Sequence, residues 1–502
     1  MLKSCVGYST NMDNILAGME TAKGALKELS NAKVGFLYTS EKNNIKELVQ
    51  GIREITNMPI IGSTSNEAII VEDGIISSQY GFAGMLAMED KNMVVGVAAH
   101  EAGKDPRAIG RRVAIEAVEN AKTTRAPAYF YMVASPKEEE EYLMGIQDVI
   151  GRVPMFGGSA ADNNVEGNWK IICNDKVFSD GVAVAFFYTD NEIITSFSGN
   201  YRETNNMGLI TEVKDDRTLV SIDGISALRK YANWINKAPS SLIGSKLLEA
   251  SASKPLGIKD PLGNLTIIRH PMIGNDMGTK TTTDDTITLG NKVVPRTAII
   301  QLEATTDELI DASVNTLREL RRQLYTEPAA YILIHSGNRR KVIGDRLNEV
   351  HKLLVKETKG VPFIMPFTFG EYGSKEHGAN TCGGLMLSFT AIGKWIGQST
   401  EVDCQNMTQE EDKKRRETSM KNLIGYEWKE ASDGNKIEVV NPATSELIDT
   451  VPNVTEEDVN KAVEVAEIEQ KKWAEVPIHE RADKLYKFVD LIEENKERLA
   501  QL

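Results

Sequence analysis

Residues 153–163 read VPMFGGSAADN, an apolar strand that runs into two glycines and then into a polar turn. The same order of strand and glycine-containing corner occurs at residues 59–69, PIIGSTSNEAI, and at residues 367–373, FTFGEYG. Glycine in such a corner lets backbone N–H groups point into a cleft and bind an anion or a carboxylate at low steric cost. The corners are therefore the first places to look for a ligand.

Short β-rich apolar runs alternate with helix-period stretches on both sides of these corners, from about residue 33 to residue 395. This alternation is typical of an α/β protein whose mixed sheets are covered by helices. The order of strand, polar turn, helix and strand recurs in the second half of the chain, which indicates two related lobes with a boundary near residues 236–239. The expected strands are residues 34–38, 93–97, 128–133, 182–187 and 330–334, and the expected helices are residues 44–55, 105–121, 137–151, 306–325 and 345–359.

The composition changes abruptly at residues 397–419, GQSTEVDCQNMTQEEDKKRRETS, which contain few large apolar residues and many charges of both signs. Such a segment is typical of a solvated linker. Beyond it, residues 437–440 alternate as a strand, residues 455–458 form a helix cap, and a second helix is expected from His479. The expected domains are residues 1–236, 237–396 and 420–502, the last being a short strand, helix and helix segment.

The chain has 502 residues, which is long for one hydrophobic core, and a net charge of -14. The acidic balance disfavours nucleic acid and anionic membrane surfaces as partners. The first residues contain no apolar signal segment, and no run approaches the roughly 18 apolar residues of a membrane span, so we expect a cytoplasmic protein without membrane insertion. The four cysteines, Cys5, Cys173, Cys382 and Cys404, are scattered, which predicts reduced thiols rather than disulfides or a zinc site.

The three corners and their surroundings resemble the FIST family, whose members are sensory modules with an N-terminal and a C-terminal part. The resemblance covers most of residues 30–395, with PIIGSTSNEAI and VPMFGGSAADN similar to two corners of the N-terminal part. Ser63 stands where many members have a cysteine. Residues 196–235 are similar to the family's strand pair, Asp-Gly turn and helix, and the matching positions there are Asp223, Gly224, Ala227 and Tyr231.

The C-terminal part of the family is matched by residues 335–350, HSGNRRKVIGDRLNEV, which resemble its arginine-bearing strand end, and by the GE corner in FTFGEYG. The resemblance implies a small-ligand sensor in intracellular signal transduction. A separate signalling protein is expected to detect the bound state, because no kinase, cyclase or methyl-accepting segment follows the sensor in this sequence.

Residues 437–485, IEVVNPATSELIDTVPNVTEEDVNKAVEVAEIEQKKWAEVPIHERADKL, look like the N-terminus of an aldehyde dehydrogenase. The sequence stops before the family's nucleotide-binding glycines, catalytic glutamate and nucleophilic cysteine would appear. The resemblance implies an incomplete dehydrogenase without catalytic residues of its own, or part of an NAD(P)-dependent aldehyde dehydrogenase system. The positions at the family's spacing are Asn441, Pro442, Thr444, Val459, Ala462, Ala466, Trp473, Pro477 and Arg481.

We expect the ligand to bind where the corners meet a few charged side chains. Arg339 can fork onto a carboxylate, and Glu371 or Asp162 can receive an amine, which together suit an amino-acid-like ligand. The alternative is that the glycines only serve tight turns and that the charged residues are ordinary surface charges. The candidate ligand-binding residues are Gly62, Ser63, Thr64, Gly157, Gly158, Ser159, Asp162, Arg339, Gly370 and Glu371.

Haem is an alternative ligand, because part of the FIST family is linked to haem and gas sensing and imidazole is a common iron ligand. No cofactor and no metal are otherwise required. Cys382 follows His377 by five residues, but this spacing alone establishes neither a base nor an oxyanion pocket, so no catalytic residue is expected. The histidines considered are His100, His270, His335 and His377 at strand ends or loops, His351 within a helix and His479 in the tail.

Overall fold

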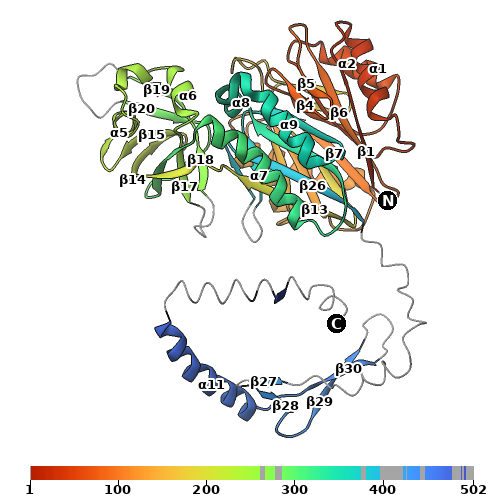
Figure 1. The fold of residues 1–502 in the computed structure, drawn as a ribbon. Coiled ribbons are helices and arrows are strands. Elements are labelled where there is room, and N and C mark those ends of the chain that lie inside the picture. Colours follow the sequence, from red (N-terminus) through yellow and green to blue (C-terminus); the bar gives the residue numbers. More distant parts are fainter. Residues whose placement is uncertain are drawn as a thin grey trace. The chain divides into compact units, whose positions relative to one another are not determined.

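The computed structural model describes residues 2–259, 266–276, 285–374, 380–395, 422–424, 427–440, 447–476, 488 and 491–492. The chain forms two compact units, Met1–Gly397 and Gln398–Leu502 (Figure 1). Among the described helices, none is both long enough and apolar enough to cross a membrane.

The first unit contains the same order of elements three times: strand, helix, strand, helix and strand, then a hairpin and a closing strand. The first repeat consists of β1 (Lys3–Ser9), α1 (Asn14–Ala25), β2 (Val34–Thr39), α2 (Ile45–Arg53), β3 (Ile60–Thr64), β4 (Ile69–Val71), β5 (Gly74–Ile76) and β6 (Ala83–Glu89). The second consists of β7 (Val94–Glu101), α3 (Pro106–Ala121), β8 (Tyr129–Ala134), α4 (Glu139–Ile150), β9 (Met155–Ser159), β10 (Ile171–Cys173), β11 (Lys176–Phe178) and β12 (Gly181–Tyr188). The third consists of β13 (Asn191–Ser198), α7 (Thr306–Gln323), β22 (Pro328–Ser336), α8 (Gly337–Ile343), α9 (Leu347–Thr358), β23 (Phe363–Thr368), β24 (Glu371–Gly373), β25 (Thr381–Gly383) and β26 (Leu387–Trp395).

Each repeat builds one six-stranded sheet but gives its hairpin to another sheet. The strand orders are β1-β6-β2-β3-β10-β11, β7-β12-β8-β9-β24-β25 and β13-β26-β22-β23-β4-β5. Each sheet has one parallel pair, β2–β3, β8–β9 or β22–β23, and its other neighbours are antiparallel. The hairpins therefore pass around the three sheets in a cycle, which interlocks the N-terminal and C-terminal halves of the unit.

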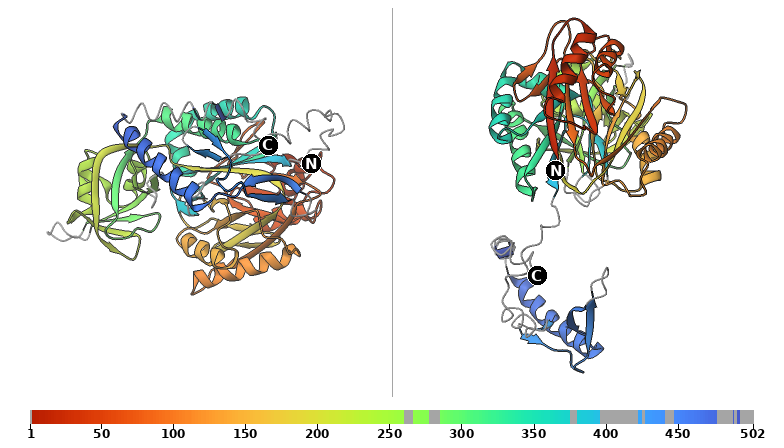
Figure 2. Two further views of the ribbon diagram at one scale, coloured as in Figure 1. Left: turned by 90° about the horizontal axis from the view of Figure 1, so that it is seen from below. Right: turned by 90° about the vertical axis from the view of Figure 1, so that its right-hand side faces the viewer.

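The inner faces of the three sheets share one hydrophobic core. Phe36, Tyr131 and Ile332, one from each sheet, belong to this core, and the rings of Phe36 and Tyr131 meet edge to face at 5.2 Å. The outer faces pack under helices: α1 and α2 on the first sheet, α3 and α4 on the second, and α7 and α9 on the third (Figure 2, right). The α/β class with mixed sheets and covering helices is thus confirmed.

Residues 202–303 form an insertion between β13 and α7 of the third repeat, drawn in yellow and green in Figure 1. The eight strands of its described residues enclose a separate core with α5 and α6. The boundary expected near residues 236–239 falls inside this insertion, and Tyr231 on one side of it packs in the same core as Leu256 on the other. The elements of the insertion are β14 (Arg202–Lys214), β15 (Thr218–Ile222), β16 (Ile225–Ser226), α5 (Ala227–Trp234), η1 (Pro239–Leu242), α6 (Lys246–Ser251), β17 (Leu256–Lys259), β18 (Thr266–Arg269), β19 (Pro271–Asn275), β20 (Thr286–Leu289) and β21 (Ala298–Glu303).

The described residues of the second unit form two hairpins and one long helix. They are β27 (Asn422–Ile424) with β28 (Glu427–Lys429), β29 (Lys436–Val440) with β30 (Leu447–Pro452), and α11 (Glu456–Glu475). The expected strand at residues 437–440 and the expected helix cap are confirmed, since Thr455 and Asp458 form a reciprocal capping box. The linker at residues 397–419 and most of the second expected helix lie outside the described residues.

A chain that ends at residue 396 is expected to unfold cooperatively with a melting temperature close to that of the full chain, because every strand of the three sheets precedes that residue. A chain that ends at residue 386 is the matched test. It lacks β26, which pairs with both β13 and β22, and it should be protease-sensitive. Thermal melts and limited proteolysis measure both, and a molten product from the longer chain would show that the second unit supplies necessary packing.

Candidate functional site

The three corners singled out in the sequence meet one another at the carboxyl ends of β3, β9 and β23. Backbone hydrogen bonds join each corner to the next in a closed ring. In this ring Asn66 N–H donates to Phe367 O at 2.9 Å, Ala161 N–H to Thr64 O at 3.1 Å, and Ser159 N–H to Gly370 O at 2.7 Å. The three corners therefore lie together in space, although they are far apart in the sequence.

The corner glycines are packed against neighbouring backbone. A Cβ atom on Gly62 would lie 1.8 Å from Leu37 O, and one on Gly157 would lie 1.9 Å from Met132 O. A Cβ atom on Gly158 would lie 2.8 Å from Gly370 O. Gly62 and Gly157 allow parallel strands to approach one another, whereas Gly158 faces the antiparallel neighbour β24. Neither of the two cavities described below is lined by these glycines.

Two predicted residues fix a loop rather than face a cavity. The carboxylate of Asp162 accepts five backbone N–H bonds from the loop that follows it, and Thr64 Oγ1 accepts a hydrogen bond from Lys170 N–H at 2.9 Å at the far end. Residues 163–170 are thereby held at both ends, and this segment is called the anchored loop below. The donors to Asp162 are Asn164 at 3.2 Å, Val165 at 2.5 Å, Glu166 at 2.9 Å, Gly167 at 2.8 Å and Asn168 at 2.8 Å.

Arg339 is fully buried at the junction between the insertion and the three-sheet body. Its guanidinium donates to Leu385 O at 3.2 Å and to Gly199 O, and it lies 5.3 Å from the ring centre of Tyr201. Burial lowers its pKa. Because Gly199 and Tyr201 lead directly into β14, Arg339 fastens the start of the insertion, a role that the surface-charge interpretation did not foresee.

Glu371 is also fully buried, and its oxygens are occupied by the chain itself. Met386 N–H donates to Oε2 at 2.7 Å and the Thr368 hydroxyl donates to Oε1 at 3.0 Å. Burial raises the pKa of Glu371 to about 8, while these donors and the charge of Arg339 oppose the rise. Glu371 therefore belongs to the packed interior beside Ser159, whose hydroxyl lies 2.6 Å from that of Tyr372.

The anchored loop borders two cavities. The first, called the α6–α8 cavity, has a volume of about 550 Å³ and lies between the insertion and the third repeat. Asn338 lies in its wall and is 4% exposed. The other lining residues are Asn164, Val165, Ser245, Leu248, Glu249, Ala252, Lys341 and Val342.

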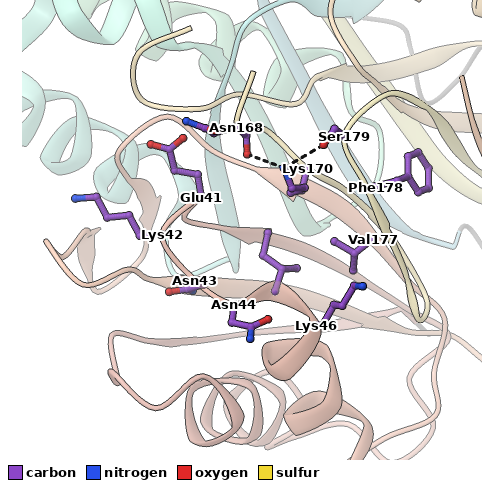
Figure 3. Close-up of a pocket in the computed structure, with 11 residues that line it drawn as sticks. Glu41, Lys42, Asn43, Asn44, Lys46, Asn168, Lys170, Val177, Phe178 and Ser179 are labelled. Atoms are coloured by element: carbon purple, nitrogen blue, oxygen red, sulfur yellow. Dashed lines mark hydrogen bonds between the residues drawn. The ribbon is translucent and has the colours of Figure 1, made fainter. Parts of the chain in front are cut away.

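The second, called the α2 cavity, has a volume of about 620 Å³ and lies at the start of α2 (Figure 3). Three lysines line it, and Lys170 is held in place by Asn168 O, Trp169 O and the Ser179 hydroxyl at 3.1–3.3 Å. The full lining is Glu41, Lys42, Asn43, Asn44, Ile45, Lys46, Asn168, Lys170, Val177, Phe178 and Ser179.

The described histidines have other surroundings. His270 and His335 are buried, and burial lowers their pKa values to about 4 and about 3. His100 Nε2 lies 2.8 Å from Glu116, and His351 Nε2 lies 3.0 Å from Glu72 O. None of these four lines either cavity. Across the described ranges, no three His, Cys, Asp or Glu side chains gather as metal ligands, while His377 and His479 lie outside those ranges.

Cys173 and Cys382 are buried free thiols, and Cys5 is a partly buried one. Burial raises the pKa of all three. A raised thiol pKa keeps the reactive thiolate scarce at neutral pH. Cys404 lies outside the described residues.

Sequence reasoning missed the residues that line the α6–α8 cavity. Asn338 and Lys341 lie in the motif HSGNRRK, directly before and after its two arginines, so the motif could have identified them. Leu248 and Glu249 are far away in the sequence and belong to a short helix of the insertion, which no motif marks.

Three helix-covered sheets with exchanged hairpins and one β-rich insertion define the first unit as an α/β protein built from repeats. Residues 33–225 of it match the FIST N domain and residues 227–374 match the FIST C domain. The chain therefore belongs to the FIST-domain proteins. Residues 428–502 match the aldehyde dehydrogenase family, which confirms the predicted order of the three matches.

Curated relatives match the second unit. Malonate-semialdehyde dehydrogenase 1 of Bacillus thuringiensis (strain Al Hakam) is 46% identical over 84 residues, which are 16% of this chain and 17% of that enzyme. Malonate-semialdehyde dehydrogenase of Bacillus cereus (strain B4264) is 45% identical over the same shares. The chain thus spans only 17% of the length of these enzymes.

Solved structures resemble the chain weakly. Cyanuric acid hydrolase from A. caulinodans is 10% identical, with 78% of this chain and 100% of that chain covered and a TM-score of 0.29. PurLQS from Thermotoga maritima is 10% identical, with 78% and 72% covered and a TM-score of 0.20. Similarity at this level supports no inference about activity.

Proposed function

We propose that the first unit is a sensor that binds a small amino-acid-like molecule in the α6–α8 cavity. The observation that carries the proposal is the side chain of Asn338, which is 4% exposed and lines the cavity together with Lys341 and Glu249. An amide side chain offers both hydrogen-bond donors and an acceptor to a bound molecule. A ligand with an acceptor and a donor would hydrogen-bond to both ends of the Asn338 amide.

The rest of the lining suits a zwitterion with an apolar side chain. Lys341 supplies a cation for a carboxylate and Glu249 supplies an anion for an amine. Leu248 and Val342 supply apolar surface. The volume of about 550 Å³ falls in the usual range for small-molecule sites, roughly 300–1,000 Å³.

The position of the cavity explains how binding would be transmitted. Its lining residue Ala252 accepts a hydrogen bond through its carbonyl from the Tyr201 hydroxyl at 2.7 Å. The Tyr201 ring in turn lies against Arg339, which fastens the start of the insertion. A ligand that draws α6 toward α8 would therefore shift the population of insertion positions, and a separate signalling protein would detect that shift.

An amino-acid-like ligand is expected to raise the melting temperature of the full chain by a few degrees. Saturation at about a hundred times the dissociation constant adds about 2.7 kcal/mol to the free energy of unfolding. Amino acids, short organic acids and haemin are compared by thermal melts. Asn338→Leu and Lys341→Gln should each abolish the shift, because they remove the buried amide and the carboxylate partner.

Lys356→Gln on α9 is the matched control, since it removes the same charge away from the cavity. An equal shift in Lys341→Gln and Lys356→Gln would place the ligand elsewhere. A Soret band with haemin that one histidine substitution abolishes would favour the gas-sensor alternative. No shift with any compound would contradict the sensor proposal.

An aldehyde dehydrogenase role rests on the second unit alone. That unit matches 17% of the length of the related enzymes. The sensor proposal is independent of it.

A further inference from the structure

The α2 cavity lies on the opposite end of the anchored loop from the α6–α8 cavity. Asn164 and Val165 line one cavity, whereas Asn168 and Lys170 line the other. The α2 cavity is therefore a separate space with a different set of side chains, and its chemistry is considered by itself.

The lining of the α2 cavity carries an excess of positive charge. None of Lys42, Lys46 and Lys170 makes an ion pair with a carboxylate within the part of the chain that the structure describes. Lys42 donates to Gln79 O at 3.2 Å, and Lys170 is fixed by neutral oxygens. Figure 3 shows the three lysines on different sides of the cavity. This arrangement favours an anionic occupant.

The turn before α2 in the first repeat corresponds to the turn before α4 in the second repeat. A difference between these two turns explains why the α2 cavity is open. In the second repeat, the turn before α4 is covered by the insertion, where Arg217 Nη2 lies 2.5 Å from Glu140 and Lys292 N–H donates to Glu140 at 3.0 Å. There the turn is acidic and the covering groups are basic. In the first repeat the turn carries Lys42 and Lys46, and no insertion covers it, so the complementary occupant is an anion from solution.

The type of cation narrows the class of anion. Lysine binds as a point charge and suits phosphate, whereas the planar fork of arginine suits a carboxylate, and no arginine lines this cavity. The start of α2, a nine-residue helix, adds the positive end of its dipole beside Asn44. Val177 and Phe178 form an apolar wall that leaves room for an organic group.

Glu41 is the acidic residue of the lining. Its Oε2 atom is buried and has no hydrogen-bond partner in the described structure. A phosphate would be repelled by this carboxylate, but a hydroxyl or amino group of the same ligand would donate to it. The polar pattern therefore suits a molecule with a phosphate at one end and a donor at the other.

We infer that the α2 cavity is a second ligand site, for a phosphorylated small molecule that carries a hydroxyl or amino group, held by Lys42, Lys46 and Lys170. This phosphorylated ligand differs from the amino-acid-like ligand proposed for the α6–α8 cavity. The volume of about 620 Å³ admits a molecule of nucleotide size.

The test uses the full chain, with inorganic phosphate and adenosine monophosphate as probes in calorimetric titrations at low and moderate salt. Lys170→Gln is expected to weaken the binding of both probes about tenfold, and the Lys42→Gln/Lys46→Gln double variant should weaken it further, because each removes a charge from the phosphate site. Salt should weaken binding to the wild-type chain and weaken it less in the variants.

Lys91→Gln is the matched control, because Lys91 is exposed in the turn between β6 and β7 and does not line the cavity. The affinity of this variant for both probes should equal that of the wild type. If Lys170→Gln does not fold, the Lys42→Gln/Lys46→Gln double variant, which changes two exposed lysines, tests the inference by itself. Equal affinity in the control and the double variant, or no binding of either probe at millimolar concentration, would overturn the inference. The amino-acid melting shift should persist in these variants, so the two sites fail or succeed independently.

Discussion

Gly62→Ala is expected to lower the free energy of unfolding of the first unit by about 4 kcal/mol or more, because no relaxed side chain fits there. The new Cβ atom would lie 1.8 Å from Leu37 O, a backbone atom of the neighbouring parallel strand. Strand β3 would have to move away from β2, and the ring of corner hydrogen bonds would open with it. Urea denaturation followed by circular dichroism measures the loss.

Gly103→Ala is the control for this substitution. Its added Cβ atom would lie 3.3 Å from its nearest neighbour, the flexible end of Ile109. We expect a change of less than about 1 kcal/mol there. A wild-type denaturation curve for Gly62→Ala would show that the corner is loosely packed and would reopen it as a place for ligand to approach the backbone.

Raising the pH from about 6.5 to 8 is expected to lower the free energy of unfolding. Below about 6.5 the buried His270 and His335, whose pKa values are lowered to about 4 and about 3, act in the opposite direction. Burial raises the pKa of Glu371 to about 8 in the folded chain, from an ordinary value of 4.5. Between these values the folded carboxyl holds a proton that the unfolded one has lost. The stability that Glu371 contributes is therefore full below about 4.5 and falls as the pH approaches 8, by up to about 1.4 kcal/mol per pH unit for one carboxyl.

Glu139 contributes in the same direction, because burial and the neighbouring Glu140 raise its pKa while Arg217 opposes the rise. The measurement is a set of denaturation curves across this pH range. Glu371→Gln should reduce the fall in the free energy of unfolding with pH, and the Glu139→Gln/Glu371→Gln double variant should remove most of this fall. Glu54→Gln, which changes an exposed carboxyl, should leave the fall unchanged. A rise in stability with pH in the wild type would contradict the expectation.

Local pattern was sufficient to predict most helices and strands of the first unit. Residues 34–38 contain no charged residue, and the strand Val34–Thr39 is buried on both faces, so this strand could be predicted from composition alone. The corners were also predictable, because a glycine directly after a buried strand indicates a sharp turn or a close approach of two backbones. The pairing of the strands could not be predicted. Strand β4 pairs with β23, which lies almost 300 residues later in the chain, and nothing in either sequence specifies the partner.

The chemistry of the charged residues was the least predictable part. Glu139 stands in a run of four glutamates that is typical of a solvated face, yet it is 2% exposed beneath the insertion. Arg339 stands beside Arg340, but the first is buried against Tyr201 whereas the second pairs with Glu67 at the surface. Burial of single charges depends on contacts between distant segments, which periodicity does not reveal.

The exchange of hairpins governs the order in which the sheets can close as the chain leaves the ribosome. The first sheet needs β10 and β11 from the second repeat, and the second sheet needs β24 and β25 from the third. The hairpin of β4 and β5, made early, finds its partner strand only after the whole insertion has been synthesised. Until then it presents open backbone hydrogen-bonding groups to other nascent chains. Expression should therefore depend on chaperones or slow translation more than the stability of the finished unit would suggest.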